Sequence, residues 1–98
     1  TKEFERTGFR GGLNWYRNID TLWEQTPFLT DAKLHQPALF VAGEADAFIA
    51  MRRAAVESLE AAVPNLKKKV LLPGAGHWIQ QERPTEVNQL LLEFLAGR

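Results

Sequence analysis

Two side chains whose types suit acid–base catalysis, Asp46 and His77, each follow a short apolar run of the sequence. Asp46 comes four residues after Ala42, which ends the first run, and His77 lies in a glycine-containing loop after residues 69–72. If the two runs are neighbouring parallel strands, both side chains emerge at the same edge of a sheet. A carboxylate bonded to one imidazole nitrogen fixes the tautomer and stabilises the imidazolium, so the other nitrogen can act as a general base. The spacing therefore predicts an acid–histidine pair that requires a nucleophile from elsewhere.

Other acidic and histidine residues offer alternatives to this pair. Glu44 competes with Asp46 for the carboxylate role and ranks second, because it lies nearer the end of the strand and has a side chain of different reach. His35 lies in a polar connector and is expected to be only solvated. A metal site built from these four residues would lack both the His-x-x-x-His spacing and the paired cysteines that support such an assignment. We therefore expect no metal.

The strands that would position the pair are predicted by two short apolar runs. Residues 38–42 are continuously apolar, are bounded by Pro37 and Gly43, and are too few for a helix. Residues 69–72, in which Lys69 precedes three apolar residues, form the second predicted strand, which ends at Pro73. The first run is typical of a strand that is covered on both faces.

Helical periodicity surrounds these strands. A stripe of apolar residues after the first strand predicts one helix of about 14 residues; the stripe consists of Met51, Ala55, Leu59, Ala62 and Val63. The last helix is expected to begin near Pro84 and to be capped by Gly97. Upstream, a partly helical segment and a loop punctuated by glycines precede a helix predicted from Asn14 to about Gln25.

The order strand, helix, strand, helix predicts the α/β class with two parallel strands joined by a right-handed crossover. Two parallel strands alone would expose much apolar surface, because parallel sheets are normally larger and covered on both faces. We therefore interpret residues 31–98 as the C-terminal βαβα part of a larger open α/β core. Residues 1–30 are interpreted as the end of an inserted cap, or lid.

Composition excludes several classes of protein. The 98 residues carry 12 Lys and Arg against 12 Asp and Glu, so no basic surface is expected to bind nucleic acid. No apolar stretch approaches the roughly 18 residues of a membrane span. The lack of cysteine excludes disulfides and is compatible with a cytoplasmic location. Because Met51 is the only methionine, the sequence is expected to be a piece of a longer protein.

Several segments together resemble the soluble epoxide hydrolases, which are enzymes of the α/β-hydrolase fold. The most specific likeness is the cap segment Gly8 to Asn18, with the sequence GFRGGLNWYRN. It continues through Glu44 to Asp46, Gly76 to Trp78 and Arg83 to Asn88, and so extends over nearly the whole chain. The resemblance implies that the parent protein opens an epoxide through an Asp alkyl-enzyme ester, which water hydrolyses to a vicinal diol.

Carried over residue by residue, the resemblance makes Asp46 the triad acid and His77 the general base. Tyr16 becomes one of two cap tyrosines that hydrogen-bond the epoxide oxygen, and Trp78 is expected to contact the substrate. A phenol suits the first role because it stabilises negative charge as it develops on oxygen. The implied partners are a small epoxide, water and the rest of the hydrolase chain, with no cofactor; a homodimer stays open.

The family's nucleophile, an upstream Asp, has no counterpart in these residues. The triad order of nucleophile, acid and histidine fits a segment that carries the last two members, so the 98 residues alone are expected to be inactive. One alternative function is a haloalkane or haloacetate dehalogenase of the same fold. Tyr16 favours an epoxide, because a departing halide is better bound by N–H donors. A second alternative is a binding protein that kept this fold without the chemistry.

Overall fold

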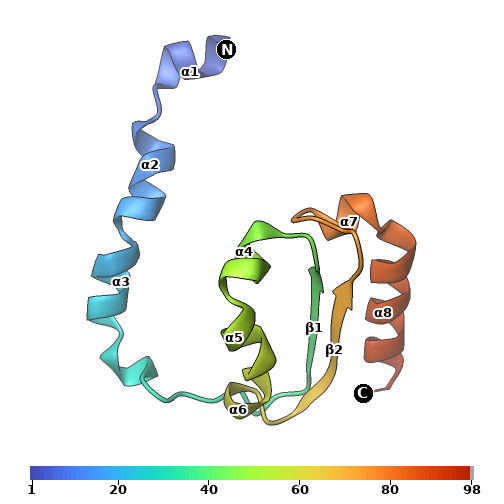
Figure 1. Ribbon diagram of the computed structural model, residues 1–98. Helices are drawn as coiled ribbons and strands as arrows, with labels where there is room; N and C mark the ends of the chain where they lie inside the picture. Colours follow the sequence, from blue (N-terminus) through green and yellow to red (C-terminus); the bar gives the residue numbers. More distant parts are fainter. Residues whose placement is uncertain (98) are drawn as a thin grey trace. The chain divides into compact units, whose positions relative to one another are not determined.

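The computed structural model describes residues 1–97 and divides the chain into two compact units, Thr1–Ala32 and Lys33–Arg98. The second unit contains the sheet, whose strands are β1 (Ala38–Gly43) and β2 (Leu66–Leu72). The two strands are parallel and lie side by side (Figure 1). The sequence thus predicted the parallel pair correctly, although β2 begins three residues earlier than expected.

The register of the two strands places their carboxyl ends level with each other. Val41 pairs with Val70 and Gly43 with Leu72, after one irregularity between Ala38 and Leu39. Because parallel strands that end together also begin their exit loops together, the loops that carry Asp46 and His77 start at the same edge.

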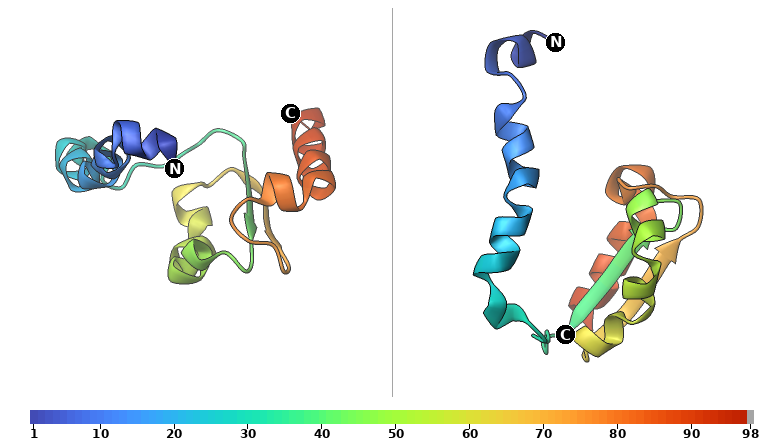
Figure 2. Two further views of the ribbon diagram at one scale, coloured as in Figure 1. Left: turned by 90° about the horizontal axis from the view of Figure 1, so that it is seen from above. Right: turned by 60° about the vertical axis from the view of Figure 1, so that its left-hand side comes forward.

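Helices lie on both sides of the strands (Figures 1 and 2). One side carries α4 (Ala47–Met51), α5 (Arg53–Glu57) and α6 (Leu59–Ala62), and the other carries α7 (Ile79–Glu82) and α8 (Pro84–Ala96). A small core of Leu72, Ala75 and Val87 lies on the α8 side, with Val41, Val70 and Ile79 packed against it. The first four residues of β1 are only half-buried, so the expected cover on both faces is incomplete for this strand.

The prediction of one continuous helix between the strands was wrong. That segment forms three short helices, with interruptions at Arg52 and Ser58. The Ser58 hydroxyl donates a hydrogen bond to the Ala54 carbonyl oxygen at 2.9 Å, a contact that competes with backbone pairing and bends helices.

The first unit consists of α1 (Lys2–Thr7), α2 (Arg10–Arg17), α3 (Ile19–Gln25) and the 3₁₀ turn η1 (Pro27–Leu29). The expected helix from Asn14 to Gln25 is therefore interrupted at Asn18, whose side-chain amide donates to the Asn14 carbonyl oxygen at 2.8 Å. Gly11 and Gly12 lie inside α2 and not in a loop, a placement that helices tolerate at about 1 kcal/mol per glycine.

The prediction for the last helix is confirmed, since α8 begins at Pro84 and is capped by Gly97. The short helix α7, between the His77 loop and α8, was not predicted because four residues carry too little periodicity. No helix of the described residues is long and apolar enough to cross a membrane.

Candidate active site

Asp46 and His77 meet at the carboxyl edge of the two strands. The Nδ1 atom of His77 lies 2.9 Å from the Oδ2 atom of Asp46. The residue Asp46 is only 8% exposed, whereas the imidazole side chain of His77 is 55% exposed. The carboxylate is thus buried, whereas more than half of the imidazole side chain is exposed in the described residues.

Asp46 is fixed by its position at the start of α4. Its Oδ1 atom accepts a hydrogen bond from the Phe48 backbone N–H at 2.9 Å, which makes Asp46 the N-cap of that helix. The two carboxylate oxygens therefore have separate partners, one in the helix and one in the imidazole.

The pKa of Asp46 lies below its ordinary value of 3.8, mainly because of the hydrogen bond with His77, while desolvation opposes the shift. The Phe48 backbone N–H lowers the pKa further. Asp46 is accordingly ionised at neutral pH and can only accept hydrogen bonds. The proton of the neutral imidazole must then lie on Nδ1, which leaves the Nε2 lone pair for a general base.

Close backbone packing brings the two loops together. Ala45 N–H donates to the Ala75 carbonyl oxygen at 2.9 Å, and Glu44 N–H donates to the Leu72 carbonyl oxygen at 3.0 Å. A Cβ atom at Gly43 would overlap the carbonyl oxygens of Ala75 and Gly76. Only glycine fits there, so Gly43 permits the approach that the acid–histidine pair requires.

The His77 loop is also held from its other side, by two consecutive residues. Glu82 accepts hydrogen bonds from the backbone N–H groups of Gly76 and Trp78, at 3.0 and 3.1 Å. Arg83 donates to the Pro73 carbonyl oxygen at 2.8 Å. Neither contact was predicted from the sequence, in which Arg83 was noted only as the start of a segment that resembles the family and the only signal for Glu82 was its position four residues after Trp78.

Two aromatic rings flank the imidazole. The Trp78 ring meets it edge-on at a centroid distance of 5.1 Å, and the Phe48 ring lies tilted at 5.6 Å. Trp78 is 59% exposed and does not belong to the small core that the described residues form. The surroundings of His77 combine an apolar wall with one charged partner.

The other candidates lie apart from this pair. Glu44 is exposed and engages the neighbouring strand through its backbone, while His35 is exposed in the connector before β1. Among residues 1–97, no group of three or more carboxylate and imidazole side chains could hold a metal ion.

Tyr16 belongs to the first unit, where it lies on α2 and is 73% exposed. With Gly12, Trp15, Ile19 and Leu22 it lines an open groove of about 490 Å³ on the α2–α3 segment. The groove presents a phenol beside apolar side chains, an arrangement that could bind an apolar molecule with one oxygen.

No family model matches the chain, but individual relatives do. It is 50% identical over 95 residues to epoxide hydrolase A of Mycobacterium tuberculosis. Among solved structures, it matches epoxide hydrolase A from Mycobacterium thermoresistibile at 52% identity with a TM-score of 0.83. Potato (Solanum tuberosum) epoxide hydrolase I matches at 33% identity with a TM-score of 0.85.

This chain is homologous to the C-terminal part of α/β-hydrolase-fold epoxide hydrolases. The matches include 97, 98 and 99% of the chain but only 29, 30 and 32% of those three relatives, respectively. The chain thus spans less than a third of the length of these epoxide hydrolases. The comparisons confirm the predicted family and the predicted fold class, a C-terminal portion of the α/β-hydrolase fold.

Proposed function

We propose that the protein containing this chain is an epoxide hydrolase in which Asp46 is the triad acid and His77 the general base. The observation that carries the proposal is the 2.9 Å contact between His77 Nδ1 and Asp46 Oδ2 in a homologue of epoxide hydrolases. The pair has the geometry of an oriented base, because the ionised carboxylate fixes the tautomer and the exposed imidazole can reach water.

In the first half-reaction, a carboxylate from the remainder of the protein attacks a ring carbon of the epoxide. A carbon–oxygen ester bond forms, the ring carbon–oxygen bond breaks, and the ring oxygen carries the released electron pair. The Tyr16 phenol donates a hydrogen bond or proton to this oxygen and so stabilises the developing charge. Trp78 contributes apolar surface on the substrate side of His77.

In the second half-reaction, water hydrolyses the alkyl-enzyme ester. The Nε2 atom of His77 takes a proton from the water while its oxygen attacks the ester carbonyl carbon. The ester carbon–oxygen bond then breaks, and the leaving oxygen takes up the proton held by His77. The second proton of the water replaces the one that Tyr16 gave to the ring oxygen, so a vicinal diol leaves and the nucleophilic carboxylate is regenerated. Asp46 stabilises the imidazolium formed in this step, because its negatively charged Oδ2 atom accepts the hydrogen bond from the Nδ1–H of His77.

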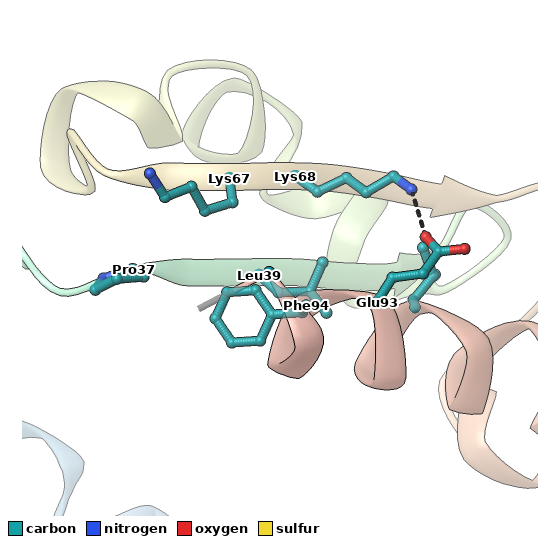
Figure 3. A pocket seen from close by; sticks show the side chains of 8 residues that line it. Pro37, Leu39, Lys67, Lys68, Glu93 and Phe94 are labelled. Atoms are coloured by element: carbon teal, nitrogen blue, oxygen red, sulfur yellow. Dashed lines mark hydrogen bonds and ion pairs between the residues drawn. The ribbon is translucent and has the colours of Figure 1, made fainter.

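The rest of the hydrolase sheet is the partner we propose for the free edge of β1. Strand β2 carries Lys67, Lys68 and Lys69, and lysines are typical of sheet edges that avoid further pairing. Strand β1 has no charged residue between Ala38 and Gly43 and lines a groove of about 390 Å³ with α8 (Figure 3). In Figure 3, Leu39 and Phe94 form the apolar side of this groove, and the Lys68–Glu93 ion pair spans β2 and α8.

The same proposal assigns residues 31–98 to the hydrolase core and residues 1–30 to the cap. Its support is the boundary between the two compact units near residue 32 and the contrast between a sheet-containing unit and a helical one. The cytoplasmic location and a homodimer remain predictions.

The decisive experiment compares the wild-type complete protein with its His77→Ala variant, using a chromogenic epoxide. We expect diol formation by the wild type and a loss of turnover of about 10²- to 10⁴-fold in the variant. The variant should still form the ester, which intact-protein mass spectrometry detects as an added substrate mass. A His35→Ala variant is the matched control and should turn over normally. Chloride release from haloalkanes without diol formation from any epoxide would contradict the proposal.

A further inference from the structure

Glu82 forms hydrogen bonds with the backbone on both sides of His77. Its Oε1 atom accepts a hydrogen bond from the Gly76 N–H at 3.0 Å, and its Oε2 atom accepts one from the Trp78 N–H at 3.1 Å. One carboxylate therefore binds the two peptide groups that flank the imidazole-bearing residue. Bonds from N–H donors to an ionised acceptor are stronger than those to neutral acceptors.

Capping of α7 does not account for both contacts. Trp78 is the N-cap residue of α7, and its N–H is bonded by Glu82, which lies one position beyond the residue that makes the return bond in a capping box. Gly76, however, lies two residues before the cap and outside the helix. A side chain that served only the helix would not need the Gly76 contact.

The loop is also shaped to let the carboxylate approach. A Cβ atom at residue 76 would lie 3.2 Å from both oxygens of Glu82, closer than most side-chain contacts allow. Gly74 has a φ of 73°, in the left-handed region that favours glycine. Two glycines give this loop conformational freedom, so its position depends on contacts such as those from Glu82.

We propose that Glu82 is a positioning residue for His77, which it holds at hydrogen-bonding distance from Asp46. The expected effect on ester hydrolysis rests on the proposed function. The expected effect on the position of His77 rests on the loop geometry alone. Glu82 contacts only backbone groups of the loop and acts through them. Without it, the loop can relax and His77 Nδ1 moves beyond the roughly 3.2 Å at which its bond to Asp46 is strong.

The test uses the complete protein with Glu82→Ala, Glu82→Gln and, as matched control, Gln81→Ala, an exposed residue of the same helix. The first readout is the low-field proton resonance of the His77–Asp46 hydrogen bond, which requires no substrate. The second is single-turnover kinetics, which separate formation of the ester from its hydrolysis.

In Glu82→Ala we expect a shifted or lost resonance and ester hydrolysis slowed by about 10- to 100-fold, the scale of a misplaced catalytic group. Ester formation should stay near the wild-type rate, because His77 acts only in the second half-reaction. Glu82→Gln keeps one acceptor oxygen and should lose only about fivefold, the value of one hydrogen bond. Gln81→Ala should behave as the wild type.

Two results would overturn the inference. One is an unchanged resonance and hydrolysis rate in Glu82→Ala. The other is an equal loss in both half-reactions together with a lowered melting temperature, which would give Glu82 a role in stability only. If the wild type opened no epoxide, the proposed function would fail, whereas the resonance would still decide whether Glu82 positions His77.

Discussion

The two units of the chain acquire their structure in different ways. In the first unit, Thr1–Ala32, the hydrogen bonds join residues at most four positions apart, and none of its residues is buried. In the second unit, Asp46 and His77 are 31 positions apart and meet within 2.9 Å. The first unit is specified by local sequence, and the second by the register of two strands.

This difference has a consequence for the proposed chemistry. The large apolar side chains of the first unit are exposed, among them Trp15, Trp23 and Phe28. A surface of that kind needs a partner to bury it. The acid–histidine pair, by contrast, is already assembled within the second unit. Local structure therefore suffices to place Tyr16 on a helix, but its proposed role depends on what covers that helix.

The largest effect on stability that we expect comes from Gly43→Ala, because the new Cβ would overlap the carbonyl groups of Ala75 and Gly76. The two loops must separate, which should destabilise the complete protein by about 3 kcal/mol, as overpacking does, and remove the low-field resonance of the pair. Denaturant unfolding measures the first change and proton NMR the second. Gly97→Ala is the control, since its Cβ would come no closer than 3.4 Å to another atom. Equal stability of the two variants would show that long-range packing does not assemble the pair.

The next largest effect is expected for Tyr16→Phe. This change in the first unit should affect ester formation only, whereas changes to His77 in the second unit should affect ester hydrolysis. Loss of one donor to a developing oxyanion should slow ester formation by roughly 10- to 100-fold, or one to a few kcal/mol of barrier. Ester hydrolysis should not change, whereas His77→Ala should produce the opposite pattern. Stopped-flow single-turnover measurements distinguish the two steps. Unchanged ester formation in Tyr16→Phe, matching an Arg17→Lys control, would remove Tyr16 from the mechanism.

Much of the second unit could be predicted because its signals are local and strong. The apolar run between Pro37 and Gly43 and the shorter one before Pro73 predicted two short parallel strands, and the ends of these strands predicted where Asp46 and His77 meet. The interruptions at Asn18 and Ser58 could not be predicted, because a side chain that competes for a backbone carbonyl leaves the apolar periodicity unchanged. The contacts of Glu82 were also missed. They depend on loop shape, which the residues acquire only when the strands pair.

A smaller effect should follow Gly12→Ala in the first unit. Gly12 lies inside α2 and a Cβ there would have no atom within 4 Å, so alanine should favour the helix by about 1 kcal/mol. The far-ultraviolet circular dichroism of a peptide of residues 1–32 measures the gain in helix content. Gly8→Ala is the matched control, because Gly8 has a φ of 67° and alanine would be strained there. An equal change in helix content in the two variants would contradict the conclusion that local sequence specifies the structure of this unit.

The smallest expected effect is a pH dependence of the stability of the second unit. Because folding lowers the pKa of Asp46, its ionised form stabilises the folded state at pH values above the ordinary 3.8. This stabilisation should be lost as the pH falls through the lower pKa of the folded state. Asp46→Asn should remove that part of the acid dependence while keeping the N-cap, since Asn caps a helix as well as Asp.

Denaturant midpoints between about pH 3 and pH 7, the range that spans carboxyl titration, measure the difference between wild type and variant. Glu44→Gln is the control, because Glu44 is exposed and its side chain lies outside the pair. Glu60 and Glu93, whose pKa values are also lowered by hydrogen bonds, with Lys69 for Glu60 and mainly with Gln89 for Glu93, remain in every variant and contribute equally. The wild-type and Asp46→Asn midpoints should therefore converge toward low pH. Parallel curves for the two proteins would mean that the contact with His77 contributes no stability, and that the pair is held together by the backbone around it.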